Sequence, residues 1–216
     1  MAPPTLLTTQ LDSFISRLGS TPAPIHAFNM YSFDLAANAV RRRNLGLYLR
    51  QMLEKQPEAL LVGEAPGYRG CRWTGVTFMS EDILLRGVEP VGMFGAHRGY
   101  STTGESVKPW KEISATIVWK SLAKLKHLPV LWAAYPFHPH RPNEPLTNRP
   151  PTKEELKLGE WFIKELVAIF AIKKVIAVGN HAEATLTNLG FTVPKIRHPA
   201  NGGANQFAAG VAFHLK

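Results

Sequence analysis

Short apolar runs rich in β-branched residues alternate along the chain with longer segments of helical periodicity. The apolar runs cover residues 59–64, 129–134, 173–179 and 191–198. Their length and continuous apolarity are typical of buried strands. The helical patterns cover residues 33–55, 110–126 and 152–170. Strands that alternate with helices form parallel sheets with right-handed crossovers. We therefore predict an α/β protein, a three-layer α/β/α sandwich around a central, mainly parallel four-stranded sheet.

Local signals mark two helix starts. Thr152 and Glu155, after a proline, have the spacing of a capping box, in which each residue bonds the backbone of the other. Asn180 and Glu183 repeat that spacing. We expect helices to begin at both places.

The proline- and glycine-rich segments 87–109 and 136–151 are predicted to be surface loops, long enough to suggest a function. No repeat or low-complexity linker divides the chain. We interpret residues 1–216 as one domain, with an N-terminal helical region at residues 1–57 packed on it.

Polar residues follow each predicted strand, where ligands bind in parallel α/β sheets. Glu64 and a glycine turn come after one strand, the segment 134–142 after the next, Asn180 after a third, and the segment 197–203, which holds His198, after the last. Taken singly, Glu64 could bind amides of its own turn and His198 could be a half-buried histidine with satisfied bonds. Their shared position at the strand ends favours a common site.

Composition and charge limit the possible binding partners and the cellular compartment. The chain has 25 Lys and Arg against 16 Asp and Glu, a net charge of +9, which favours a polyanion such as nucleic acid. A single cysteine, Cys71, excludes an internal disulfide and fits a reducing compartment. The first residues lack a signal-peptide pattern, and no apolar run approaches the roughly 20 residues of a membrane span. We expect a cytosolic protein that does not bind membranes.

The sequence lacks the motifs of several common classes of enzyme and binding protein. There is no dinucleotide fingerprint, no phosphate-binding P-loop and no G-x-S-x-G nucleophile elbow. Cys71 has no evident base, and His138 and His140 lack further ligands for a metal. We predict no metal site and no cofactor.

Five ordered motifs resemble those of the uracil-DNA glycosylase superfamily. They are VGEAPG (62–67), TGVTF (74–78), NRPPTKEE (148–155), VIAVGNHA (175–182) and RHPA (197–200). The resemblance spans residues 58–205 and is nearest to the bacterial branch with GEAPG in its first motif. That branch commonly carries an iron–sulfur cluster on four cysteines, which this chain cannot supply. The chain resembles a cluster-free relative.

The resemblance implies a monofunctional, metal-independent enzyme of base excision repair that flips deoxyuridine out of single- or double-stranded DNA and releases uracil. Glu64 would orient water and offset positive charge on the sugar, and a neutral His198 would donate a hydrogen bond to uracil O2. Phe78 would stack on the base, or would be plain core packing. The implied substrate-binding residues are Gly63, Ala65, Pro66, Gly67, Tyr68, Phe78, Ala133, His138 and Asn180. The implied DNA-binding residues are Arg69, Arg149, Arg197, Asn201, Gly202, Gly203 and Gln206.

The chain departs from the pattern at two places. Ala133 stands where relatives commonly place an asparagine that reads the base, so Asn180, His138, backbone groups or water would have to replace it. The loop after the histidine-proline motif has Asn201, Gly202 and Gly203 where several relatives insert an apolar wedge.

Two rival interpretations stay open. One is a catalytically impaired protein of the same fold that binds uracil or abasic sites in DNA. The other is an α/β hydrolase of free nucleotides or small glycosides, for which basic loops would be superfluous. For the glycosylase we expect a monomer.

Overall fold

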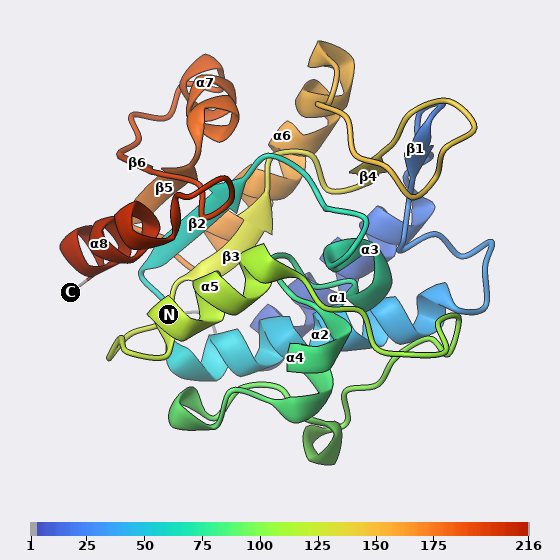
Figure 1. The fold of residues 1–216 in the computed structure, drawn as a ribbon, viewed down its shortest axis with the longest axis horizontal. Helices are drawn as coiled ribbons and strands as arrows, with labels where there is room; N and C mark the ends of the chain where they lie inside the picture. Colours follow the sequence, from blue (N-terminus) through green and yellow to red (C-terminus); the bar gives the residue numbers. More distant parts are fainter. Residues whose placement is uncertain (1–3, 216) are drawn as a thin grey trace.

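A four-stranded parallel sheet forms the centre of the molecule (Figure 1). The computed structural model describes residues 4–215. The strands lie in the order β3-β2-β5-β6, with all neighbours parallel. Their bounds are β2 (Ala59–Gly63), β3 (Val130–Ala133), β5 (Lys174–Val178) and β6 (Lys195–Ile196). The predicted fold class and all four strand positions are confirmed.

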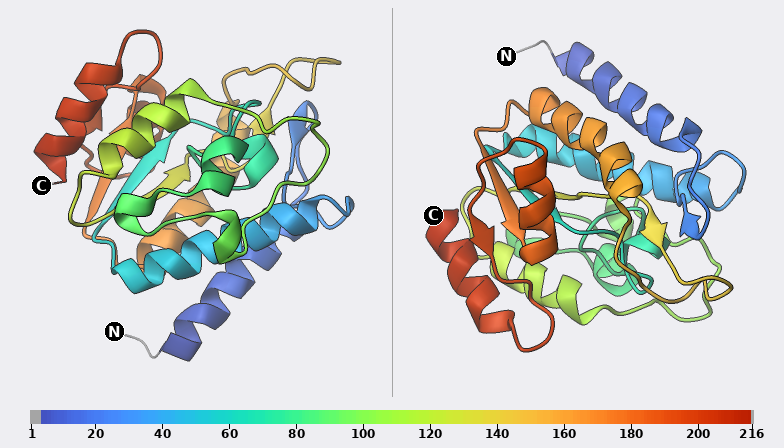
Figure 2. Two further views of the ribbon diagram at one scale, coloured as in Figure 1. Left: turned by 60° about the horizontal axis from the view of Figure 1, so that its bottom comes forward. Right: turned by 90° about the horizontal axis from the view of Figure 1, so that it is seen from above.

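Helices cover both faces of the sheet (Figure 2). The longer ones are α1 (Pro4–Ser20), α2 (Asn38–Lys55), α5 (Ile113–Leu122), α6 (Lys153–Ile169), α7 (Asn180–Asn188) and α8 (Ala204–His214). One face carries α2 and α6, with α1 outside them, and the other carries α5 and α8. The short elements are α3 (Cys71–Thr74), α4 (Glu81–Arg86), the 3-10 turns η1 (Glu89–Val91) and η2 (Ala96–Arg98), and the paired strands β1 (Ala27–Phe28) and β4 (His138–Pro139).

The last strand is much shorter than its apolar run. Residues 191–198 were predicted as a strand, but β6 contains only Lys195 and Ile196. Pro194 has no N–H to donate to a ladder, and its carbonyl accepts a single bond from Ala177 at 2.9 Å. The shortening brings the chain out of the sheet two residues before His198.

Helices begin at both predicted places, but only one of them has the predicted capping box. Thr152 Oγ1 accepts a bond from the Glu155 amide at 3.3 Å, and the Glu155 carboxylate accepts one from the Thr152 amide at 2.8 Å, which completes the capping box. At α7 the residue before the helix is Gly179, not Asn180, and no side chain caps it. Glu183 instead lies 2.7 Å from Lys195 of β6, so an ion pair across the crossover replaces the cap.

The N-terminal helices pack on the sheet through aromatic residues. Leu11, Phe14 and Leu18 of α1 are buried, and the Phe14 ring contacts Trp132 of β3 edge-on at 5.4 Å. These side chains belong to a continuous apolar cluster that reaches as far as Val211 of α8. Among residues 4–215, no helix combines the length and apolarity that crossing a membrane would require.

Gly159 lets α6 approach the sheet closely, and its replacement by alanine should destabilise the fold. An added β-carbon would lie 1.8 Å from the Ala134 carbonyl oxygen, so α6 would have to move off β3. Alanine favours helices by about 1 kcal/mol over glycine, but overpacking of this kind costs about 1–3 kcal/mol or more. We expect a lower urea midpoint for Gly159→Ala than for Lys157→Ala, an exposed position on the same helix. Equal midpoints would contradict this packing.

Candidate functional site

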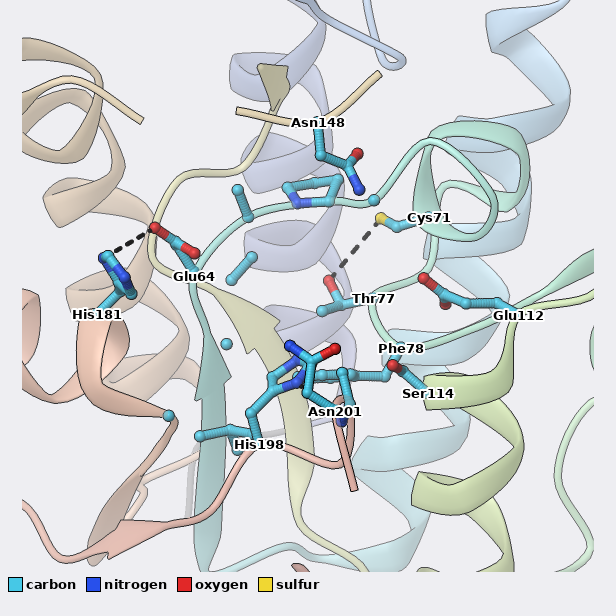
Figure 3. Close-up of a pocket in the computed structure, with 18 of the residues that line it drawn as sticks. Glu64, Cys71, Thr77, Phe78, Glu112, Ser114, Asn148, His181, His198 and Asn201 are labelled. Atoms are coloured by element: carbon cyan, nitrogen blue, oxygen red, sulfur yellow. Dashed lines mark hydrogen bonds and ion pairs between the residues drawn. The ribbon is translucent and has the colours of Figure 1, made fainter. Parts of the chain in front are cut away.

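A cavity of about 700 Å³ opens beyond the carboxyl ends of the strands (Figure 3). Each strand contributes to its lining: Glu64 follows β2, Ala133 ends β3, Asn180 follows β5, and His198 comes shortly after β6. Parallel strands end at the same edge of the sheet, which is why residues distant in sequence converge here. The sequence-predicted acid and histidine therefore share one pocket.

Glu64 projects from the end of β2 towards the start of α7. Its carboxylate Oε1 lies 3.3 Å from Nδ1 of His181, which is the only side-chain partner of Glu64 within residues 4–215. Partial burial raises the pKa of Glu64, and the nearby His181 opposes that rise. Glu64 makes no bond to amides of its own turn, so its acceptor atoms remain available to a water or a substrate.

His198 is held in one tautomer by its own loop. The Ala200 amide donates a hydrogen bond to Nδ1 at 3.2 Å, so in the neutral ring the proton is on Nε2. Burial lowers the pKa of His198, and the adjacent Arg197 lowers it further. The ring is therefore neutral at neutral pH and presents Nε2–H as a donor in the pocket.

Phe78 forms an apolar wall beside this histidine. Its backbone has φ 54°, a strained value for a phenylalanine, and Trp119 Nε1 donates to its carbonyl at 3.0 Å. The ring lies against Gly63, where an added β-carbon would be 2.6 Å from Cζ. The Phe78 and His198 ring centres are 6.3 Å apart. Phe78 thus lines the pocket as well as packing on the core.

The pocket brings together twelve of the sequence-predicted residues. They are Gly63, Glu64, Ala65, Pro66, Gly67, Phe78, Ala133, Arg149, Asn180, Arg197, His198 and Asn201. Six others do not line it, namely Tyr68, Arg69, His138, Gly202, Gly203 and Gln206. Of these, Gln206 lies exposed on α8, while Gly203 is buried under the His198 carbonyl.

His138 cannot read a base in the pocket, contrary to expectation. It is fully buried; its Nδ1 accepts from Arg72 at 3.1 Å and its Nε2 donates to the Thr147 carbonyl at 2.9 Å. Burial, followed by the positive charge of Arg72, lowers the pKa of His138 to about 4. One ring nitrogen is therefore bonded to Arg72 of α3 and the other to the 136–151 loop, so His138 is a neutral histidine with a structural role.

Arg149 is also committed to the protein. Its guanidinium makes two 2.7 Å bonds to the buried Glu155 carboxylate and further bonds to the carbonyls of His26 and His140. Little donor capacity is left for a phosphate. Arg197 is exposed and makes only long bonds, of 3.2 and 3.4 Å, to carbonyls of its own loop.

Sequence reasoning missed several pocket residues. They are Cys71, Thr77, Glu112, Ser114, Asn148, Val178, Gly179, His181 and Ala200. Asn148 and His181 stand inside the quoted motifs, so those motifs could have indicated them. Glu112 follows the long 87–109 loop and belongs to no motif, and nothing local signals its position.

Asn148 places one amide group at the pocket. Its Oδ1 accepts from the Tyr68 amide at 3.0 Å and lies 3.3 Å from Nε2 of His138, whereas its Nδ2 has no partner within residues 4–215. Asn148 therefore fixes the 66–70 loop and keeps a free donor.

Cys71 lies in the pocket wall but is unsuited to nucleophilic or metal chemistry. Its thiol is buried, 4.0 Å from both Tyr31 Oη and Thr77 Oγ1, and burial raises its pKa to about 12. In the described chain, no group of three or more histidine, cysteine or acidic side chains could hold a metal ion.

Comparisons with known proteins agree with the fold and the motifs. The family model described as the uracil DNA glycosylase superfamily matches residues 51–214. The crystal structure of wild-type Pedobacter heparinus SMUG2 is similar, with a TM-score of 0.64 and 14% sequence identity. The similarity covers 96% of each chain. No curated protein matches the sequence.

Proposed function

Because the chain belongs to the uracil DNA glycosylase superfamily, we propose that it hydrolyses the N-glycosidic bond of deoxyuridine in DNA, releasing uracil and leaving an abasic site. The observation that carries this proposal is the convergence of Glu64, His198 and Phe78 on one cavity. A DNA base must leave the duplex stack to reach such a pocket.

Breaking this bond separates charge, and the pocket has a group for each sign. The sugar becomes positive, and the Glu64 carboxylate would offset that charge and orient the attacking water. The departing uracil becomes negative at O2, where the Nε2–H of His198 would donate. Phe78 would stack on the base, a contact worth about 1–3 kcal/mol in proteins that bind single strands.

The reaction would stop at the abasic site. Lyase activity needs an amine that forms a Schiff base with the sugar. The described residues that line the pocket include no lysine. The enzyme would therefore be monofunctional and would serve base excision repair.

DNA contacts would come from the pocket rim. Arg197 and Asn201 lie at the pocket and are exposed, and Arg69 is exposed on the loop after Gly67. The net charge of +9 adds a general attraction to phosphates.

An oligonucleotide with a single deoxyuridine tests the proposal. After incubation with the protein, alkali should cut the strand at the uracil position, and a thymine-containing control should stay intact. Free deoxyuridine should be a poor substrate, because it offers no phosphates to the rim.

The rival functions give different results in the same assay. Tight retention of the oligonucleotide without base release would favour a lesion-binding protein, which the apolar Ala133 in the pocket makes worth testing. Faster cleavage of free deoxyuridine than of DNA would favour a nucleoside hydrolase. If the protein neither releases uracil nor binds the oligonucleotide, the proposal is refuted.

A further inference from the structure

A second carboxyl group, Glu112, faces the same pocket from the side opposite Glu64. Figure 3 shows the two carboxyls on opposite sides, with Thr77 and Phe78 between them. Glu112 is the residue before α5, and its side chain lies under the 66–70 loop. Added β-carbons on Gly67 and Gly70 would be 3.0 Å and 2.3 Å from its two carboxylate oxygens. The absence of side chains at these glycines makes room for the carboxyl.

The Glu112 side chain has no hydrogen-bond or ion-pair partner within residues 4–215. Its carboxyl caps no amide of α5, forms no ion pair and accepts no hydrogen bond from these residues, although its backbone carbonyl accepts bonds from both the amide and the hydroxyl of Thr116. A desolvated carboxylate without a cation or donor favours its protonated form. Burial raises the pKa of Glu112 to about 7.

The titratable neighbours do not supply a counter-charge. Cys71 of α3 stands on the same wall and is uncharged, and Glu64, His181 and His198 face Glu112 across the cavity. Two arginines also line the pocket, but Arg149 is paired with Glu155 and Arg197 bonds its own loop. On its own segment Lys111 is exposed.

Uracil presents groups that the other pocket residues leave unmatched. If His198 donates a hydrogen bond to uracil O2, the adjoining N3–H donor and O4 acceptor of the base still need partners. Ala133 has no polar side chain, and Asn148 has a free donor but already uses its Oδ1 for the Tyr68 amide. A protonated carboxyl has one acceptor and one donor, the same pair that a carboxamide offers.

We propose that protonated Glu112 reads the base, accepting from uracil N3–H and donating to O4. This inference rests on the proposed function, which it extends to the group that holds the N3–H and O4 edge of the base. Ionisation of Glu112 would remove its donor and repel the base as it becomes an anion.

The consequence is a loss of uracil release on the alkaline side. The contribution of Glu112 is complete below its pKa and disappears as pH rises through about 7. The wild-type kcat/KM should therefore fall by about tenfold per pH unit above that value.

Three variants test this by kcat/KM on the deoxyuridine oligonucleotide across pH. Glu112→Gln keeps a donor and an acceptor and should retain activity near pH 6 with no fall at alkaline pH. Glu112→Ala should lose about 10–100-fold at acid and neutral pH, the range expected when a bidentate base contact is removed. Lys111→Ala, at the exposed neighbouring position, should keep the wild-type profile. Thermal unfolding confirms that each variant is folded.

The outcomes separate this inference from the proposed function. Wild-type kcat/KM in Glu112→Ala, or an unchanged alkaline fall in Glu112→Gln, would overturn the role of Glu112 while uracil release stands. If the wild-type protein releases no uracil, the proposed function fails, and binding of the same oligonucleotide near pH 6 and pH 8.5 becomes the readout. Binding that weakens at the higher pH in wild type and not in Glu112→Gln supports base reading. Binding that is equal in all variants refutes it.

Discussion

Replacing His198 by alanine should slow uracil release by about 100–1000-fold, the cost of removing one donor to a developing anion. The Ala200 amide fixes the proton on Nε2, and the lowered pKa keeps the ring neutral, so the donor is already in place before the bond breaks. The loss should appear in the rate constant of base release measured under single-turnover conditions. Binding of the oligonucleotide should change far less, because O2 carries little charge before reaction.

His97→Ala is the matched control, since His97 is exposed on η2 away from the pocket lining. It should retain the wild-type rate. A His198→Ala protein that is folded and works within about threefold of wild type would show that the anion is stabilised elsewhere.

Replacing Glu64 by glutamine should cost about 10²–10⁴-fold in kcat, the range for loss of a positioned acid–base group. Glutamine keeps the size of the side chain but carries no charge to offset that of the sugar. The variant should still bind the uracil-containing strand, since the carboxylate acts on the reacting sugar and water. A small effect on kcat with a large effect on binding would contradict this role.

The pH profile provides an independent test of Glu64. Burial raises its pKa above 4.5 and His181 opposes the rise, so the active carboxylate is lost as pH falls through that raised value. His181→Ala should move the acid limb to higher pH, because it removes the opposing contact at 3.3 Å. Glu183→Gln, on the same helix but paired with Lys195, should leave the limb in place. An acid limb that is identical in His181→Ala and wild type would exclude the coupling.

Glu64 and Glu112 should together produce a bell-shaped dependence of kcat/KM on pH. Each limb of the bell has a different carboxyl as its cause. Glu64 works ionised and fails on the acid side, whereas Glu112 works protonated and fails on the alkaline side. Both pKa values are raised by burial, and only Glu64 has a neighbouring side chain, His181, that opposes the rise. Two carboxyls thus acquire opposite tasks from their surroundings.

Periodicity and strand ends were enough to predict the fold and the centre of the site. Continuous apolar runs predict strands buried on both faces, and the capping box at Thr152 is a local bond between residues three apart. Parallel strands end together, so Glu64 and His198 could be expected at one edge before any coordinates. The helix α8, which carries Gln206, was not among the predicted elements.

The tertiary structure decided how the polar side chains are oriented and which segments distant in the sequence come into contact. Nothing in the sequence shows that His138 turns inward to Arg72 and Thr147, or that Arg149 spends its donors on Glu155. Glu112 fits at the pocket because Gly67 and Gly70, in a loop far away in the sequence, leave room for its carboxyl. Local sequence encodes periods and caps, which depend on neighbours a few residues away. Which polar atoms are left unpaired depends on how segments far apart in the chain pack, and that is settled only when the whole core forms.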